Sequence, residues 1–143
     1  MNRFTDEEFL GALNGVVEVA GDAHVYEPDG DTDHMRRVKM GGDLHVATPY
    51  SYEGCIVGKV IQRLDPRYYH KLLDAEVEKG ASFNIRTAPP KVREALRRRF
   101  TRPQLAALSE AQGWQDNGSN WGKARDVGIE MLEIQKRLGE KGV

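Results

Sequence analysis

Cysteine is nearly absent from this sequence, because Cys55 is the only one among 143 residues. A single cysteine excludes an internal disulfide framework, and this scarcity indicates a reducing compartment. Long apolar runs are absent too, which excludes a membrane-spanning helix, and residues 1–8 carry no apolar secretory segment. We therefore expect a cytoplasmic protein without a membrane partner.

An excess of charge of one sign is also missing. The 21 lysines and arginines nearly balance the 22 aspartates and glutamates, giving a formal net charge of −1. Bulk charge therefore favours neither nucleic acid nor a membrane surface as a partner, and only a local cluster can do so. With 39% hydrophobic and 30% charged residues, the composition is typical of a folded chain, and the length fits one domain over residues 1–143.

Start signals for helices recur along the chain. Thr5 and Glu8 have the spacing of a capping box, and Asp65–Pro66 and Thr101–Pro103 combine an N-cap residue with an early proline. Apolar residues at spacings of three and four follow these signals. The pattern predicts about five helices. The clearest ranges are 6–19, 55–64, 66–80, 90–99 and 121–138, with a further start at Thr101.

The segment between the first two predicted helices has the pattern of strands. His24 to Glu27 are compatible with a short strand, and Val38 to Val46 alternate apolar and polar residues around a turn at Gly41 to Asp43. We expect a β-hairpin or a small antiparallel sheet near residues 24–48, packed against the helices. The predicted fold class is therefore α+β, mainly helical.

Motifs that carry catalysis or bind metals are missing. Asp29 to His34 begins like a calcium loop, but His34 replaces the required glycine and Met40 the bidentate glutamate. The four histidines lack zinc-ligand spacing, and the sequence has neither a Gly-x-Ser-x-Gly elbow nor a phosphate-binding glycine loop. Cys55 is typical of a buried core residue, with a reactive thiol at a helix N-terminus as the alternative. We expect no catalytic residue, no metal and no cofactor.

The strongest functional signal is a basic run that follows Pro89–Pro90. Six basic residues stand there against one acid, Glu94: Lys91, Arg93, Arg97, Arg98, Arg99 and Arg102. On a helix, Arg93 and Arg97 share a face that lies away from Leu96. Such a face can contact phosphates, which predicts a nucleic-acid or anion-binding site with steep salt dependence. The alternative is an ordinary solvated helix face whose charges pair with acids elsewhere.

The polar stretch from Gly113 to Asn120 is predicted to be a loop, with Trp114 near its start and Trp121 after it. An exposed tryptophan is a favoured anchor for a protein partner, so Trp114 is a candidate partner-binding residue; packing at a helix end is the alternative. A helix-turn-helix from Pro103 onward is rejected, because this loop has eight residues where three or four are expected.

Two stretches carry a resemblance to known proteins. The first is Tyr52-Glu53-Gly54-Cys55-Ile56-Val57-Gly58, followed by an apolar helix, and the second is Gln115-Asp116-Asn117-Gly118-Ser119-Asn120-Trp121-Gly122-Lys123-Ala124. In this order they resemble motifs of small uncharacterised accessory proteins of actinobacterial bacteriophages. The resemblance implies a phage protein that acts inside a bacterial host by binding a host factor, and it transfers no active-site residue.

These observations lead to two functional expectations. The first is a non-enzymatic interaction protein that binds a host macromolecule, with a host protein as partner. The alternative is a nucleic-acid-binding protein that uses the basic residues 91–102. In both, Gly58 and Gly122 allow close helix packing, Cys55 and Trp121 fill the core, and function resides on the outside. The oligomeric state stays open, because the apolar stripe from Trp121 to Leu138 could pair with a second copy.

Overall fold

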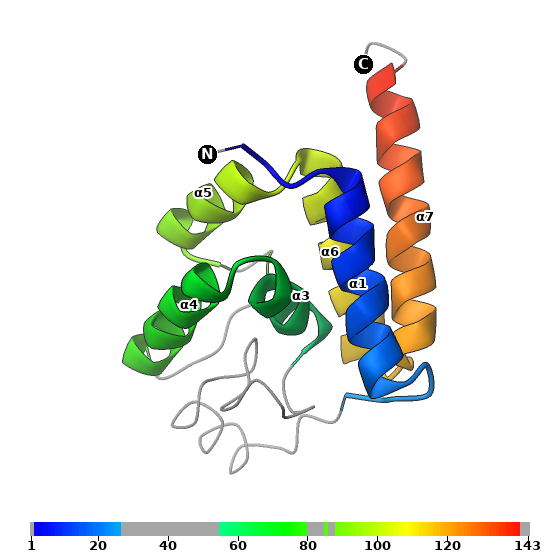
Figure 1. Cartoon of the computed structure of the whole chain (residues 1–143), viewed down its shortest axis with the longest axis horizontal. Helices are drawn as coiled ribbons and strands as arrows, with labels where there is room; N and C mark the ends of the chain where they lie inside the picture. Colours follow the sequence, from blue (N-terminus) through cyan, green and yellow to red (C-terminus); the bar gives the residue numbers. More distant parts are fainter. Residues whose placement is uncertain (1, 27–54, 80–84, 86–87, 141–143) are drawn as a thin grey trace.

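The computed structural model describes residues 2–26, 55–79, 85 and 88–140, and these residues form six helices and no strand (Figure 1). The helices are α1 (Asp6–Ala20), α3 (Ile56–Leu64), α4 (Pro66–Lys79), α5 (Pro90–Arg99), α6 (Arg102–Asp116) and α7 (Trp121–Glu140). The α+β prediction is therefore wrong for the described part of the chain, which is mainly helical. The predicted hairpin of Val38 to Val46 lies outside the described residues.

The described part of the expected 24–48 sheet has another role. Val25 makes an isolated antiparallel bridge with Asn120, directly before α7, and pairs with no strand of the described residues. The first N–H groups of α7 use this segment as acceptor: Trp121 N–H donates to the His24 carbonyl (2.8 Å) and Gly122 N–H to that of Asp22 (2.9 Å). Because a helix leaves its first N–H groups without internal partners, an extended segment can satisfy them without forming a sheet.

Capping accounts for where several helices begin. The predicted box at the start of α1 is confirmed, since Glu8 N–H donates to the Thr5 hydroxyl and Thr5 N–H to the Glu8 carboxylate. Thr101 and Gln104 form the same reciprocal pair at α6. Asp65 accepts from Tyr68 N–H at the start of α4. Each such cap contributes about 1 kcal/mol.

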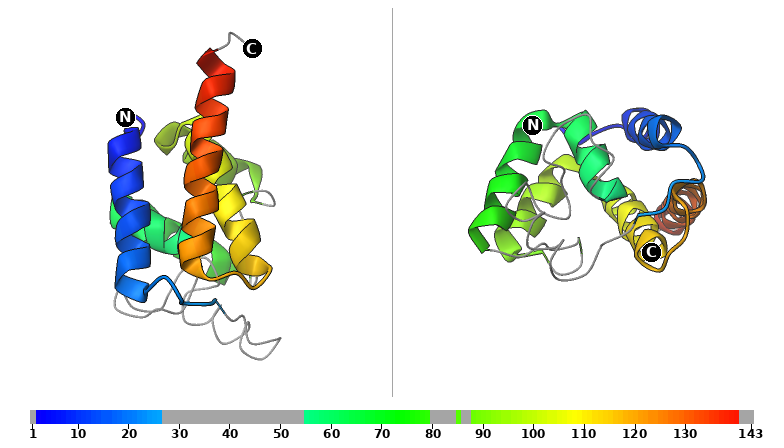
Figure 2. Two further views of the ribbon diagram at one scale, coloured as in Figure 1. Left: turned by 90° about the vertical axis from the view of Figure 1, so that its right-hand side faces the viewer. Right: turned by 90° about the horizontal axis from the view of Figure 1, so that it is seen from below.

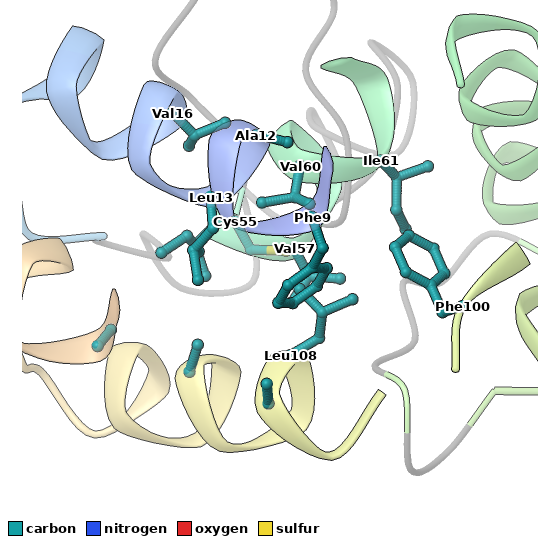
Figure 3. Packing of buried hydrophobic residues seen from close by; sticks show 14 of the residues in the cluster. Phe9, Ala12, Leu13, Val16, Cys55, Val57, Val60, Ile61, Phe100 and Leu108 are labelled. Carbon is teal, nitrogen blue, oxygen red and sulfur yellow. The ribbon is translucent and has the colours of Figure 1, made fainter. Parts of the chain in front are cut away.

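The core is built mainly by α1, α3, α6 and α7. Helices α6 and α7 run antiparallel, side by side, while α4 and α5 lie on the side of α3 and α6 away from α7 (Figures 1 and 2). Phe9 of α1, Val57 of α3 and Leu108 of α6 are fully buried in one cluster (Figure 3). Trp121 at the start of α7 is also fully buried.

The loop between α6 and α7 is shorter than predicted. Helix α6 continues to Asp116, leaving only four residues, 117–120, where an eight-residue loop was expected. The first half of the predicted loop, residues 113–116, is helical, and Gln115 within it is fully buried. The loop-length reason for rejecting a helix-turn-helix therefore fails. The rejection rests instead on packing, because α6 and α7 lie alongside each other rather than crossing steeply.

Close approach of α6 and α7 depends on a glycine. A Cβ added at Gly128 would lie 3.2 Å from the Ala107 carbonyl oxygen and 3.4 Å from the Ala111 Cβ, so a larger side chain would push the two helices apart.

Within the described ranges, no helix combines the length and hydropathy required to cross a bilayer.

Candidate functional site

The two stretches that carry the resemblance meet inside the molecule. Gln115, fully buried on α6, accepts a hydrogen bond from the Ile56 backbone N–H at 2.6 Å. Gln112 Nε2 lies 3.8 Å from the Cys55 sulfur, which in turn accepts from Gly58 N–H at 3.4 Å. The buried Cys55 thus caps α3 and is held by α6, which is a structural arrangement.

Gly122 belongs to the same structural framework. A Cβ at this position would lie 2.9 Å from the Asp22 Cβ, closer than real Cβ atoms approach, and 3.1 Å from the Asp22 carbonyl oxygen, which is also tight. Only glycine therefore lets the start of α7 approach the segment after α1. His24 stacks edge-on against Trp121, with ring centroids 4.5 Å apart, and its burial lowers its pKa below the ordinary value of 6.5.

The N-terminal segment closes the end of α5. The last carbonyls of a helix have no internal donor. Here Arg3 Nε donates to the Arg97 carbonyl (2.7 Å) and Phe4 N–H to the Arg99 carbonyl (2.8 Å). Gln104, fully buried on α6, holds the same segment by donating to the Phe4 carbonyl at 2.9 Å. These bonds fix the Arg3 side chain beside the end of α5.

The exposed basic residues form one surface around α5, which we call the basic surface. It consists of Arg3, Lys91, Arg93, Arg97, Arg98 and Arg102, all of them exposed. Arg98 pairs with Glu94 of the next turn at 2.8 Å, with both side chains 65% exposed. Across the described ranges, Lys91, Arg93, Arg97 and Arg102 have no carboxylate within ion-pair distance. Most of this positive charge is therefore not paired with an acid of the described residues.

Arg99 differs from the other arginines of the run. Its Nε lies 2.9 Å from Asp65 Oδ2, with the two side chains only 16% and 15% exposed, and its guanidinium stands 3.9 Å above the Tyr68 ring. Burial opposes ionisation of Asp65, but hydrogen bonds from Tyr68 N–H and Arg99 outweigh it, so the pKa of Asp65 lies below 3.8. Burial raises the pKa of Tyr68 to about 12. Arg99 holds α4 and α5 together and is not part of the exposed surface.

A hollow of about 650 Å³ lies within the basic surface. It is lined by Arg3, Arg97, Phe100, Thr101, Arg102 and Leu105. Three separate segments, the N-terminus, the end of α5 and the start of α6, thus bring three guanidinium groups around a partly apolar floor, and no acid is part of this lining. Guanidinium groups bind phosphate oxygens in pairs of hydrogen bonds, so the lining of this hollow has the chemistry that suits an anion.

Trp114 lies on α6, opposite the beginning of α7. Its side chain is 39% exposed, its Nε1 donates to Glu110 at 3.2 Å, and Lys123 Nζ stands 5.5 Å from the ring centroid. The residue is thus neither part of the core nor isolated in solvent. The ring is therefore partly covered by the protein and partly open to solvent.

Arg3 is the component of the basic surface that sequence reasoning missed. It lies 94 positions before Arg97, and no local pattern connects the two. The only usable sign is a general one: the last carbonyl groups of a helix have no donor within the helix. The helix that ends at Arg99 therefore needs hydrogen-bond donors from another segment.

Comparisons with protein families, curated proteins and solved structures returned no match to this chain. The resemblance to phage accessory proteins therefore stays a prediction.

Within the described ranges, no three His, Cys, Asp or Glu side chains are grouped closely enough to hold a metal ion, and Asp29 to His34 lies outside those ranges.

Proposed function

We propose that this chain is a non-enzymatic protein that binds nucleic acid through the basic surface. The observation that carries the proposal is the concentration of unpaired positive charge around the hollow. Residues 91–102 contain six bases and one acid, a net charge of +5, so the rest of the chain, with a total of −1, carries −6. A nearly neutral chain with a local excess of positive charge can attract a polyanion there, while its net negative remainder disfavours binding elsewhere.

The spacing of the exposed arginines supports backbone contacts. Arg93 and Arg97 lie one helical turn apart, and Arg97 shares the hollow with Arg102 and Arg3. One helical turn rises only about 5.4 Å, so the two long arginine side chains can reach neighbouring phosphates of one strand. Contacts of this kind position a protein on nucleic acid without reading sequence, so we expect weak sequence preference.

The proposal is tested by a matched pair of charge-removal variants. In a gel-shift or anisotropy assay with labelled duplex DNA and RNA at low salt, Arg93→Ala/Arg97→Ala should weaken binding by about tenfold or more, equally across sequences. The control Arg67→Ala/Lys71→Ala removes the same charge from two exposed positions one turn apart on α4 and should change affinity less than threefold or so. Absence of binding by the wild-type chain, or equal losses in the two variants, would contradict the proposal.

A host protein is the second candidate partner, and the exposure of Trp114 favours it. A half-open aromatic ring supported by a lysine is a common anchor in protein interfaces. Together with the resemblance to phage accessory proteins, this supports a role in the host cytoplasm.

This second candidate is tested by a pull-down from an actinobacterial lysate. The Trp114→Ala variant should lose, by tenfold or so in recovered amount, a protein that the wild-type chain retains at high stringency. Recovery of the same proteins by both chains would contradict it.

A further inference from the structure

The apolar stripe of α7 divides into two lines of residues. One line faces the core and is buried: Trp121, Ala124, Gly128 and Leu132. The other, which we call the outer ridge, consists of Val127, Met131, Ile134 and Leu138. Val127 and Met131 are half-buried, whereas Ile134 and Leu138 are 39% and 47% exposed. The last turns of α7 also extend beyond the other helices (Figure 1). The described residues therefore leave Ile134 and Leu138 partly open to solvent.

The spacing of the outer ridge is that of a coiled-coil seam. Its members follow one another by four, three and four residues, which keeps them on one side of a helix that pairs with another helix. Trp114 lies on the same side of the molecule. Lys123 stands over the Trp114 ring and is one helical turn before Val127, the first residue of the outer ridge. Trp114, Ile134 and Leu138 are three of the five large hydrophobic side chains exposed within the described ranges.

We propose that the outer ridge binds the outer ridge of a second copy of this chain in antiparallel orientation. The ridge is self-complementary in that orientation: Val127 would meet the partner's Leu138, and Met131 would meet the partner's Ile134. A two-fold axis repeats each contact, as closed homodimers require. Each copy would thereby cover the two side chains that the other leaves most exposed.

Charge complementarity selects a second copy in this orientation. Glu130 and Arg137 each directly precede a ridge residue, and both are exposed on the same edge of the seam. Neither has an ion-pair partner within the described ranges. In the antiparallel pair, Glu130 approaches the partner's Arg137, and the symmetry produces this attraction twice. A parallel pair would instead place Glu130 opposite the partner's Gln135, which carries no charge to attract it.

The interface is too small for a permanent dimer. Four ridge residues per copy, with Trp114 at one end, bury less than the roughly 800 Å² per partner of a standard stable interface. The dimer therefore forms and dissociates with concentration. Because α5 does not contribute to the ridge, each copy keeps its basic surface, and the inference does not depend on nucleic-acid binding.

Sedimentation velocity over a concentration series, from a few to several hundred micromolar or so, measures this equilibrium directly. We expect a reversible monomer–dimer equilibrium for the wild-type chain. The charge-reversal variants Glu130→Arg and Arg137→Glu should each raise the dissociation constant by about tenfold, because two attractions become two repulsions. Thermal unfolding of the variants should stay within a few degrees of wild type, since both positions are exposed.

Two recombinations of these variants make the test specific. An equimolar mixture of the two single variants should dimerise as well as wild type, because each supplies the charge that the other lacks. The double variant Glu130→Arg/Arg137→Glu should also recover wild-type affinity, which only the antiparallel register allows. A chain that stays monomeric throughout the series, or a double variant that fails to recover, overturns the proposal. If Ile134→Asp/Leu138→Asp abolishes capture of another protein while the wild-type chain remains monomeric, the ridge serves that protein instead.

Discussion

At the scale of single residues, polar side chains on α6 hold the molecule together from inside. Gln104 fixes the N-terminal segment, Gln112 reaches the Cys55 sulfur, and Gln115 supplies the acceptor for the first N–H of α3. A buried hydrogen bond contributes only about 1 kcal/mol net, but an orphaned buried group costs more. These glutamines therefore specify how the helices meet.

Replacing Gln115 tests this role. In Gln115→Ala, the buried Ile56 N–H loses its acceptor, so the free energy of unfolding should fall by about 1 to 3 kcal/mol in a urea titration followed by circular dichroism. The control Gln135→Ala removes a partly exposed glutamine whose amide contacts only the Met131 sulfur in the described residues, at 3.7 Å, and it should change stability by less than about 0.5 kcal/mol. Equal effects in the two variants would refute the assignment.

Residue identity explains what sequence reasoning could and could not predict. The capping signals of Thr5 and Thr101 act within four residues, so the helix starts were predictable. Gln115 was assigned to a loop and Arg99 to an exposed face, because the buried partner of each lies more than 30 positions away in the sequence. A polar residue looks like a loop or surface residue until its buried partner is known.

At the scale of elements, α4 and α5 are joined by the ion pair of Asp65 and Arg99. The pKa of Asp65 is lowered, so this carboxylate stabilises the folded state at pH values above its ordinary pKa. As the pH falls from about 5 through the folded-state pKa, protonation removes the ion pair and this part of the stability is lost.

The pH dependence of an Asp65→Asn variant checks this. Asparagine retains a capping oxygen but no charge, so the variant should be less stable than wild type by about 2 kcal/mol at pH 7, and the difference should shrink towards pH 2. Asp6 and His24 also have lowered pKa values and weaken the fold in acid, but both chains share these contributions. A difference that is independent of pH in thermal unfolding would exclude the ion pair as its cause.

The element scale also explains the error in fold class. Extended residues such as Val25 were expected to pair into a sheet, but their described hydrogen bonds go to the start of α7. Alternation of apolar and polar residues predicts that the backbone is extended, but it does not predict which segment that backbone hydrogen-bonds to. The six helices of the described ranges were largely foreseeable from caps and periodicity, whereas the four-residue turn between α6 and α7 was not.

At the scale of the whole molecule, the two proposed surfaces lie on different elements. The basic surface gathers on α5, the start of α6 and the N-terminal segment, while the outer ridge lies on α7. A dimer through α7 would carry two basic surfaces, and two weak contacts on one polyanion bind more tightly than one. The helical framework, including both motifs of the resemblance, supports these surfaces from beneath.

The most direct test of the central claim is the salt dependence of DNA binding, measured by fluorescence anisotropy at several salt concentrations. If Arg93 and Arg97 contact phosphates, the logarithm of the association constant should fall linearly with the logarithm of salt concentration, and the slope for Arg93→Ala/Arg97→Ala should be shallower by about 2. An unchanged slope in that variant, or no binding by the wild-type chain even at low salt, would show that the basic surface is only a solvated helix face.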